Sequence, residues 1–212
     1  MSPVVDRYEL GPIGTNCYVV RAAADAAEAV VVDPGGDADA LLRELGRTGA
    51  RCDAILVTHT HWDHLGGVAD LAEATGAPVS VSALESPVLE RPDDFYPGMG
   101  VRPHTAEIRL AGDETFEAGG LRWETLRVPG HSPGHLAFHA DGVLFAGDVL
   151  FANSVGRVDL PFGDWDTLLD SIRLLLDRFA PETTVCPGHG PPTTLADELA
   201  RNPFLAEVRA AR

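Results

Sequence analysis

The sequence predicts an α/β protein whose polar strand ends gather at one edge, and three observations support this fold class. Short runs rich in Val, Ile and Leu repeatedly end in a loop that carries Asp or His. Segments with helical apolar spacing alternate with these runs. The chain has 212 residues, 45% of them hydrophobic and 23% charged, which favours one compact domain over residues 1–212.

The predicted strands resemble one another in how they end. Each is a short apolar run that leads into a loop with Asp or His. The runs are VVVDPG at 30–35, AILVTHTH at 54–61, ETLRVPGH at 124–131, VLFAGD at 143–148 and TTVCPGH at 183–189. If these strands share sheets, their ends bring the polar side chains to one edge, where scaffolds commonly display functional loops.

Two helices and one long loop complete the predicted organisation. Asp37 can cap a helix that carries three leucines on one side, and Asp164 can cap a helix that runs to about Phe179. The second helix has an apolar stripe suited to packing on a sheet. The stripe consists of Leu168, Ile172, Leu175, Leu176 and Phe179. Residues 85–105 contain four prolines and two glycines without a sustained period, which predicts a long loop.

Charge and composition exclude several classes of function. The formal net charge is −16, and nucleic-acid binders need basic surface, so no nucleic-acid partner is expected. All 16 basic residues are arginine. No apolar run approaches the roughly 20 residues of a spanning helix, and the first ten residues lack a secretory pattern, so we expect a cytoplasmic protein without membrane contact. The three cysteines lack CxxC spacing, which argues against a disulfide framework and a thiolate zinc site.

The run THTHWDHLGG at 58–67 is the most informative motif. It places His59, His61, Asp63 and His64 within six positions, directly after a predicted strand. A turn there can bring imidazoles and a carboxylate to one centre. Neutral imidazole together with carboxylate suits zinc, iron or manganese. The run therefore predicts a metal site.

Three further candidates lie far along the chain, each in a glycine-containing loop after a predicted strand. They are His131 in VPGHSPGH, Asp148 in FAGD and His189 in CPGHGP. Each signal alone is weak, because such turns are common at strand ends. Together with the first cluster they supply five histidines and two aspartates, enough ligands for two metal ions. For His135, either an outer hydrogen bond that orients a ligand or an ordinary structural role is open.

The order HxHxDH, then a distant His, an Asp and a last His, resembles the metallo-β-lactamase superfamily over nearly the whole chain. The resemblance implies a four-layer αββα sandwich with the metal site at one edge of the two sheets. It also implies a division of the ligands between two divalent ions. One ion would be held by His59, His61 and His131, the other by Asp63, His64 and His189, and Asp148 would bridge them.

The implied chemistry is hydrolysis without a serine or cysteine nucleophile. A divalent ion lowers the pKa of bound water from about 15.7 to about 7 and so supplies hydroxide at neutral pH. The resemblance implies hydroxide held between the ions as the nucleophile, with Asp63 and Asp148 as the catalytic carboxylates. Zinc is the first expectation for both ions, and iron or manganese would also suit these ligands. The oligomeric state is not indicated by the sequence.

The segment LFANSVGRVDLPFGD at 150–164 is similar to the one that follows the bridging aspartate in glyoxalase II-like (hydroxyacylglutathione hydrolase-like) thioester hydrolases. TNCY at 15–18 and NPFL at 202–205 resemble the same group. The implied substrate is a small-thiol thioester such as S-lactoyl-glutathione. Only 23 residues follow His189, so the single-domain branch is the closer match. Arg157 and Tyr96 are candidates for substrate binding, although Arg157 could equally pair with Asp159.

Other functions remain as alternatives. A persulfide dioxygenase resembles this chain but would bind one iron through His59, His131 and Asp148; the final PGHGP looks more like the hydrolases. A lactone or ester hydrolase could use the same fold, and a module that has lost catalysis would be expected to lack some ligands. A β-lactamase is not expected, because such enzymes usually have a cysteine ligand or lack the second histidine of HxDH.

Overall fold

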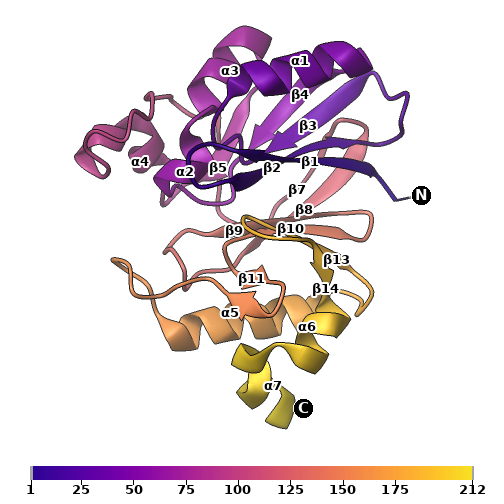
Figure 1. The fold of residues 1–212 in the computed structure, drawn as a ribbon, viewed down its shortest axis with the longest axis vertical. Helices are drawn as coiled ribbons and strands as arrows, with labels where there is room; N and C mark the ends of the chain where they lie inside the picture. The colour runs from indigo at the N-terminus through magenta and orange to yellow at the C-terminus, as the bar shows by residue number, and fades with distance from the viewer. Residues whose placement is uncertain (1, 212) are drawn as a thin grey trace.

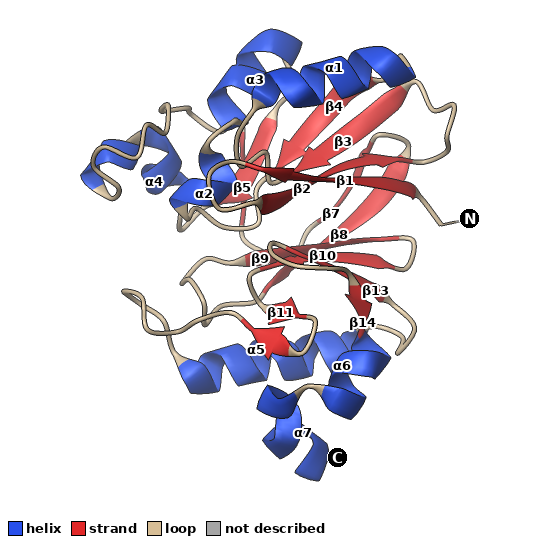
Figure 2. Cartoon of the chain, in the orientation of Figure 1, coloured by secondary structure: helices blue, strands red, loops and turns tan. Residues whose placement is uncertain are grey.

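Two mixed β-sheets face each other and each is covered on its outer side by helices (Figure 2). The structure, a computed structural model, describes residues 2–211. This arrangement confirms the predicted α/β class and the four-layer αββα order. The first half of the chain forms one sheet with its helices, and the second half forms the other (Figure 1).

The first sheet has the strand order β1-β2-β3-β4-β5-β6. Strand β2 is antiparallel to both of its neighbours, β1 and β3. Strands β3, β4, β5 and β6 run parallel to one another. The bounds are β1 (Val4–Leu10), β2 (Thr15–Arg21), β3 (Glu28–Val32), β4 (Arg51–Leu56), β5 (Val79–Ser82) and β6 (Ile108–Leu110). The helices of this half are α1 (Ala38–Thr48), α2 (Trp62–Leu65), α3 (Val68–Thr75), α4 (Ser86–Glu90) and the 3-10 turn η1 (Pro92–Asp94).

The second sheet has the order β14-β13-β10-β9-β8-β7. Its bounds are β7 (Thr115–Ala118), β8 (Leu121–Arg127), β9 (Leu136–Ala140), β10 (Val143–Gly147), β13 (Thr184–Pro187) and β14 (Thr193–Thr194). Strands β11 (Leu150–Phe151) and β12 (Ser154–Val155) pair with each other as a separate two-stranded antiparallel sheet. The helices are α5 (Trp165–Arg178), α6 (Leu195–Arg201), the 3-10 turn η2 (Pro203–Leu205) and α7 (Ala206–Ala210).

Strand direction brings the polar loops to one edge. Strands β3 and β4 are parallel, so the loops that follow them leave at the same edge of the first sheet. In the second sheet, β8 and β10 are both antiparallel to β9, and β13 is parallel to β10. The loops after β8, β10 and β13 therefore also leave at one edge. The backbone bond from Leu136 N to Thr58 O, 2.7 Å, joins the two sheets there.

The predicted helices form with the predicted caps. The Asp37 side chain accepts a hydrogen bond from Ala40 N at the start of α1, and the Asp164 side chain accepts one from Thr167 N at the start of α5. In α5 the side chains of Leu168, Ile172 and Leu175 are buried against the second sheet. The sequence pattern thus predicted the contact face of this helix.

The prediction of one long loop over 85–105 is wrong in its first part, where α4 and η1 form. Pro87 lies in the first turn of α4, where a missing N–H costs nothing because that N–H has no partner within the helix. Leu89 is fully buried and anchors this short helix to the first core. Among residues 2–211, no helix is long and apolar enough to cross a membrane.

The apolar layer between the sheets depends on large aromatic side chains. Phe145 is fully buried and lies 5.3 Å from the Tyr18 ring and 5.6 Å from the Trp123 ring, measured between centroids. Tyr18 comes from the first sheet, whereas Phe145 and Trp123 come from the second. These rings therefore hold the two halves together by burial and edge-to-face contact.

Replacing Phe145→Ala should lower the free energy of unfolding by about 3–5 kcal/mol, because it leaves a cavity between the sheets. Denaturation by guanidinium chloride measures the change. Leu174→Ala in α5 is the control, since Leu174 is 44% exposed, and should cost less than about 1 kcal/mol. Equal losses from both variants would contradict the assignment of the core.

Candidate metal centre

The run after β4 presents its side chains through a change from extended to helical backbone. His59 follows the strand, His61 is extended with φ −65° and ψ 143°, and α2 then begins at Trp62. The first turn of α2 carries Asp63 and His64, both buried. Gly35 allows this turn to approach, because a Cβ there would lie 2.1 Å from the Asp63 carbonyl oxygen. The segment after β4 thus supplies four of the candidate ligands, close together in space.

A first group of three imidazoles faces one point. The Nδ1 atom of His61 lies 3.1 Å from Nε2 of His59 and 2.8 Å from Nε2 of His131. His131 enters from the loop after β8 on the other sheet. The three nitrogen atoms lie within 4.8 Å of one another, so these side chains could hold one metal ion.

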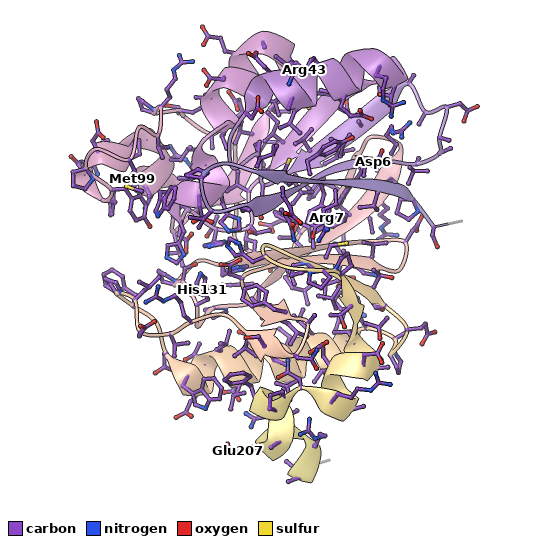
Figure 3. All side chains as sticks on the ribbon, in the orientation of Figure 1. Asp6, Arg7, Arg43, Met99, His131 and Glu207 are labelled. Atoms are coloured by element: carbon purple, nitrogen blue, oxygen red, sulfur yellow. The ribbon has the colours of Figure 1, made fainter. Side chains whose placement is uncertain are left out.

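A second group combines one carboxylate with two imidazoles. Asp63 Oδ2 lies 3.4 Å from His64 Nε2 and 3.3 Å from His189 Nε2. His189 comes from the loop after β13. These three atoms also lie within 4.8 Å of one another. Figure 3 shows the site where the two halves of the chain meet, with His131 on the side of the second sheet.

Asp148 lies between the two groups. Its Oδ1 atom is 3.4 Å from His64 Nε2, and its Oδ2 atom is 3.6 Å from His131 Nε2 and 3.5 Å from His189 Nε2. The structure thus brings all seven predicted ligands together, in two groups with one shared carboxylate.

Two buried atoms test whether a cation fits. His64 Nε2 and Asp148 Oδ1 are buried and have no hydrogen-bond partner among the described residues. Such atoms are costly to bury unless something binds them. Both point to the centre of the ligand set, where a divalent cation would satisfy them. The donor set of imidazole and carboxylate fits zinc, iron or manganese.

Burial keeps the first group of histidines neutral. It lowers the pKa of His59 well below its ordinary value and, with the charge of neighbouring His131, lowers the pKa of His61 to about 4. Burial also lowers the pKa of His131. Their lone pairs are therefore free to bind a metal at neutral pH.

The second group behaves in the opposite way. Burial alone would lower the pKa of His64, but the carboxylates of Asp148 and Asp33 raise it well above its ordinary value. The hydrogen bond to Asp63 raises the pKa of His189. For Asp148, burial opposes ionisation, yet the charge of His64 lowers its pKa to about 2. The carboxylates beside His64 and His189 therefore favour the protonated form of these two histidines.

Asp33 orients two of the imidazoles, a role that was not predicted from the sequence. One of its oxygens accepts hydrogen bonds from Thr58 Oγ1 at 2.7 Å and lies 3.0 Å from His64 Nδ1. Thr58 Oγ1 in turn lies 3.1 Å from His59 Nδ1. These contacts leave the Nε2 atoms of both histidines facing the centre, as outer hydrogen bonds do in metal sites.

Glu85 joins the two ligand loops and was also not singled out in the sequence. One oxygen of its buried carboxylate accepts bonds from N and Oγ1 of Thr60, beside His61. The other accepts bonds from Ser132 Oγ at 2.6 Å and Gly134 N at 2.8 Å, beside His131. The prediction of a long loop over residues 85–105 assigned no buried role to this residue.

Three further contacts complete the surroundings. Thr15 Oγ1 of the TNCY run donates to Asp63 Oδ2 at 2.7 Å. His135 Nε2 accepts a bond from the backbone N of Asp148 at 3.1 Å, so it acts on the backbone of a ligand and contacts no ligand side-chain atom by hydrogen bond. The backbone oxygen of Arg157 lies 2.8 Å from His131 Nδ1.

The two residues predicted to bind substrate lie in different surroundings. The Tyr96 ring centroid is 6.4 Å from that of His61, and burial raises the pKa of the Tyr96 phenol to about 12. The Arg157 guanidinium pairs with Asp159 through two bonds of 2.7 and 2.8 Å. The pairing considered as the alternative for Arg157 is therefore the one that the structure shows.

The chain belongs to the metallo-β-lactamase superfamily, because residues 10–189 match the sequence pattern of that family. It is 34% identical to hydroxyacylglutathione hydrolase GloC of Haemophilus influenzae, over 90% of this chain and 92% of that one.

Two solved structures are similar over almost their whole length. The BLEG-1 B3 metallo-beta-lactamase is 38% identical, with a TM-score of 0.89, covering 96% of this chain and all of that one (100%). TTHA1623, solved in a di-iron-bound form, is 39% identical with a TM-score of 0.78, covering 97% and 100%. The chain is thus a metallo-hydrolase superfamily member with a His/Asp cluster suited to two metal ions.

Gly188→Ala should abolish metal binding at the second group, because a Cβ there would lie 2.1 Å from Asp148 Oδ1 and 2.7 Å from His64 Cε1. Elemental analysis measures bound metal, and circular dichroism reports the fold. Gly46→Ala in α1 is the control, since a Cβ there meets nothing within 4 Å. Full metal content in Gly188→Ala would show that this space is not needed for the ligands.

Acidification should weaken the second group more than the first. Protons on His64 and His189 must leave before metal binds, and their pKa values are raised, so affinity should fall as pH decreases from 8 to 6, by at most about tenfold per pH unit for each proton displaced. The first group, with lowered pKa values, should change little over this range. Competition with a chromophoric chelator, in His189→Ala and in His61→Ala, measures each group separately. Equal pH dependence in both variants would refute the assignment.

Proposed function

We propose that this chain is a metal-dependent hydrolase that cleaves a small-thiol thioester to a carboxylic acid and a free thiol. The observation that carries the proposal is the division of seven ligands into two groups that share Asp148. The similarity to hydroxyacylglutathione hydrolase GloC supports the thioester class, with S-lactoyl-glutathione as the reference substrate. We propose a cytoplasmic enzyme with no nucleic-acid or membrane partner, in keeping with the net charge of −16.

In the proposed reaction, water adds to the thioester carbonyl carbon and the C–S bond breaks. A new C–O bond forms, and the departing sulfur takes up a proton to become a thiol. Two divalent ions, for which we propose zinc first and iron or manganese as alternatives, would lower the pKa of water and polarise the carbonyl. They would be held by His59, His61 and His131 and by Asp63, His64 and His189, with Asp148 common to both.

The residues of the chain supply charge and orientation for this chemistry. The low pKa values of Asp63 and Asp148 keep both carboxylates ionised, which offsets the charge of bound cations. The neutral imidazoles of the first group add no charge of their own. We propose Asp63 and Asp148 as the carboxylates on which catalysis depends. We propose that Tyr96, near His61, contacts the substrate. We propose that Arg157 contacts it as well, but only when its guanidinium breaks the ion pair with Asp159.

Three alternatives are tested in the same panel. The similarity to the BLEG-1 B3 metallo-beta-lactamase keeps β-lactam hydrolysis as a candidate that the sequence had set aside. An iron-dependent persulfide dioxygenase would need one iron per chain and would consume oxygen. Lactones and simple esters complete the panel.

With purified protein, we expect two metal ions per chain by elemental analysis and efficient cleavage of at least one thioester. Asp148→Asn should lower kcat/KM by more than about 100-fold, the upper end of the effect for residues that only orient a ligand. Asp170→Asn on α5 is the control, since its carboxylate only pairs with Arg173 at the surface. One iron with rapid oxygen uptake on glutathione persulfide, or cleavage confined to lactones or β-lactams, would overturn the proposal.

A further inference from the structure

Large apolar side chains are exposed on segments that contact the candidate ligands or the residues beside them. Eight such side chains are exposed among the described residues, and five of them lie on these segments, none of which itself carries a ligand. They are Ile13, Leu84, Phe95, Met99 and Phe162, with 45–81% of their surface exposed, and we call them the apolar rim. Single exposed apolar residues need no explanation, but a concentration near one site indicates a binding surface.

Two rim residues are tied to the site through their neighbours in sequence. Ile13 lies in the turn between β1 and β2, and Thr15 at the end of that turn donates to Asp63. Leu84 precedes Glu85, whose carboxylate bonds to the segment beside His131. A Cβ on Gly134 would lie 3.1 Å from the Leu84 Cβ, so Leu84 packs against that segment directly.

Phe95 and Met99 lie on the loop that carries Tyr96 toward His61. Tyr96 stands between them, with its ring centroid 6.4 Å from that of His61, and Met99 N donates to Tyr96 O at 3.2 Å. This loop and the segment 156–164 project on the same side of the molecule, one from each half (Figure 1). Met99 and His131 are labelled on this side in Figure 3.

Phe162 lies on the segment 156–164 in an unfavourable conformation. Two residues later, Asp164 N donates to the carbonyl of Gly130, next to His131, at 2.8 Å. Phe162 is 81% exposed, and its φ of 69° is in the left-handed region, which costs a bulky residue about 1–3 kcal/mol. Strain together with exposure of an aromatic ring, beside a ligand loop, points to a role in binding.

The charge of the two projecting segments is unsuited to an anionic carrier. Apart from the buried Glu85, residues 85–105 have two arginines against three acidic residues, and residues 156–164 have one arginine against two aspartates. Arg157 pairs with Asp159, and Arg102 pairs with Asp70 and Glu73. A glutathione conjugate, with two carboxylates and one ammonium, is net negative and would therefore meet a net negative surface.

We infer that the apolar rim receives the acyl chain of the substrate, so that the preferred substrates are thioesters of apolar acyl groups on an uncharged thiol. This inference rests on the proposed thioester hydrolysis and replaces S-lactoyl-glutathione as the preferred member of that class. A small molecule fits the rim, because the segments that carry it contact Asp63, the strand-end loop of His131 and the ring of His61.

Two series of thioesters test the inference in the metal-loaded enzyme. Acetyl, butanoyl, hexanoyl and octanoyl groups are attached to N-acetylcysteamine, which is uncharged, and to glutathione, and thiol release gives kcat/KM. Full burial of one methylene is worth about fourfold, so partial burial should give at least tenfold from acetyl to octanoyl. Glutathione should give no advantage over N-acetylcysteamine. A flat chain-length series, or a tenfold preference for S-lactoyl-glutathione, would overturn the inference and leave thioester hydrolysis standing.

Matched serine variants locate the effect. Phe162→Ser and Phe95→Ser should each lower the ratio of octanoyl to acetyl kcat/KM at least fivefold, through KM. Phe204→Ser, at a phenylalanine with similar exposure to Phe95 but on η2, should keep the ratio unchanged. An equal ratio in all three variants would refute the role of the rim, as would a change of oligomeric state in the rim variants alone, which would make the rim an interface between copies.

A binding measurement separates this inference from the proposed reaction. The thioether S-octyl-N-acetylcysteamine cannot be hydrolysed, and calorimetry should show that it binds the native chain at least fivefold more tightly than the Phe162→Ser variant. If the Phe162→Ser variant loses binding of the thioether and the native chain cleaves no thioester, the proposed reaction is refuted and the role of the rim in binding stands. Binding that is absent in the native chain, or equal in both proteins, would refute the rim.

Discussion

The burial of five ionisable side chains at one edge, with His61 and His189 half-buried beside them, is the constraint on which the rest of the structure depends. Each of these groups is expensive to remove from water unless it has a partner. The chain meets that cost with contacts from outside the ligand set: Asp33 for His64, Thr15 for Asp63, and the Arg157 backbone oxygen for His131. The side-chain atoms on the inner side, such as His64 Nε2 and Asp148 Oδ1, face one another. The same contacts that stabilise the fold therefore also fix which atoms are available to a cation.

Much of the fold and the meeting of the seven candidate ligands could be predicted from local sequence, because strand runs ending in Asp or His and well-capped helices are signals within a few residues. The contacts of Asp33 could not, since Thr58 and His64 are 25 and 31 residues away and meet it only through parallel pairing of β3 with β4. Glu85 was hidden for a similar reason: an acidic residue among prolines usually lies at the surface. Its four hydrogen bonds come from two segments that only the packed sheets bring together.

The reacting centre and the parts that select a substrate are built from different kinds of structure. The candidate ligands lie close after buried strands, and hydrogen bonds from outside the ligand set orient His64, Asp63 and His131. The rim residues lie on loops whose side chains have few packing partners, so the surface they offer can change without disturbing the centre. The family therefore indicates a metal centre in this chain, whereas its own loop residues form the exposed surface around that centre. Arg157 illustrates the difference: its backbone oxygen serves the centre and its side chain pairs with Asp159 in solvent.

The division of the chain into two sheets, each continuous in sequence, has a consequence during synthesis. Residues 4–110 supply the first sheet, and residues 115–194 supply the second. When the first sheet leaves the ribosome, its inner face, with Tyr18, Val20 and Val30, has nothing to cover it. Four metal ligands are present by then, but three are still to be made. A nascent chain at this stage exposes an apolar surface that is prone to aggregation, and its cation site is incomplete. Translation of the second half covers this surface and supplies the remaining candidate ligands.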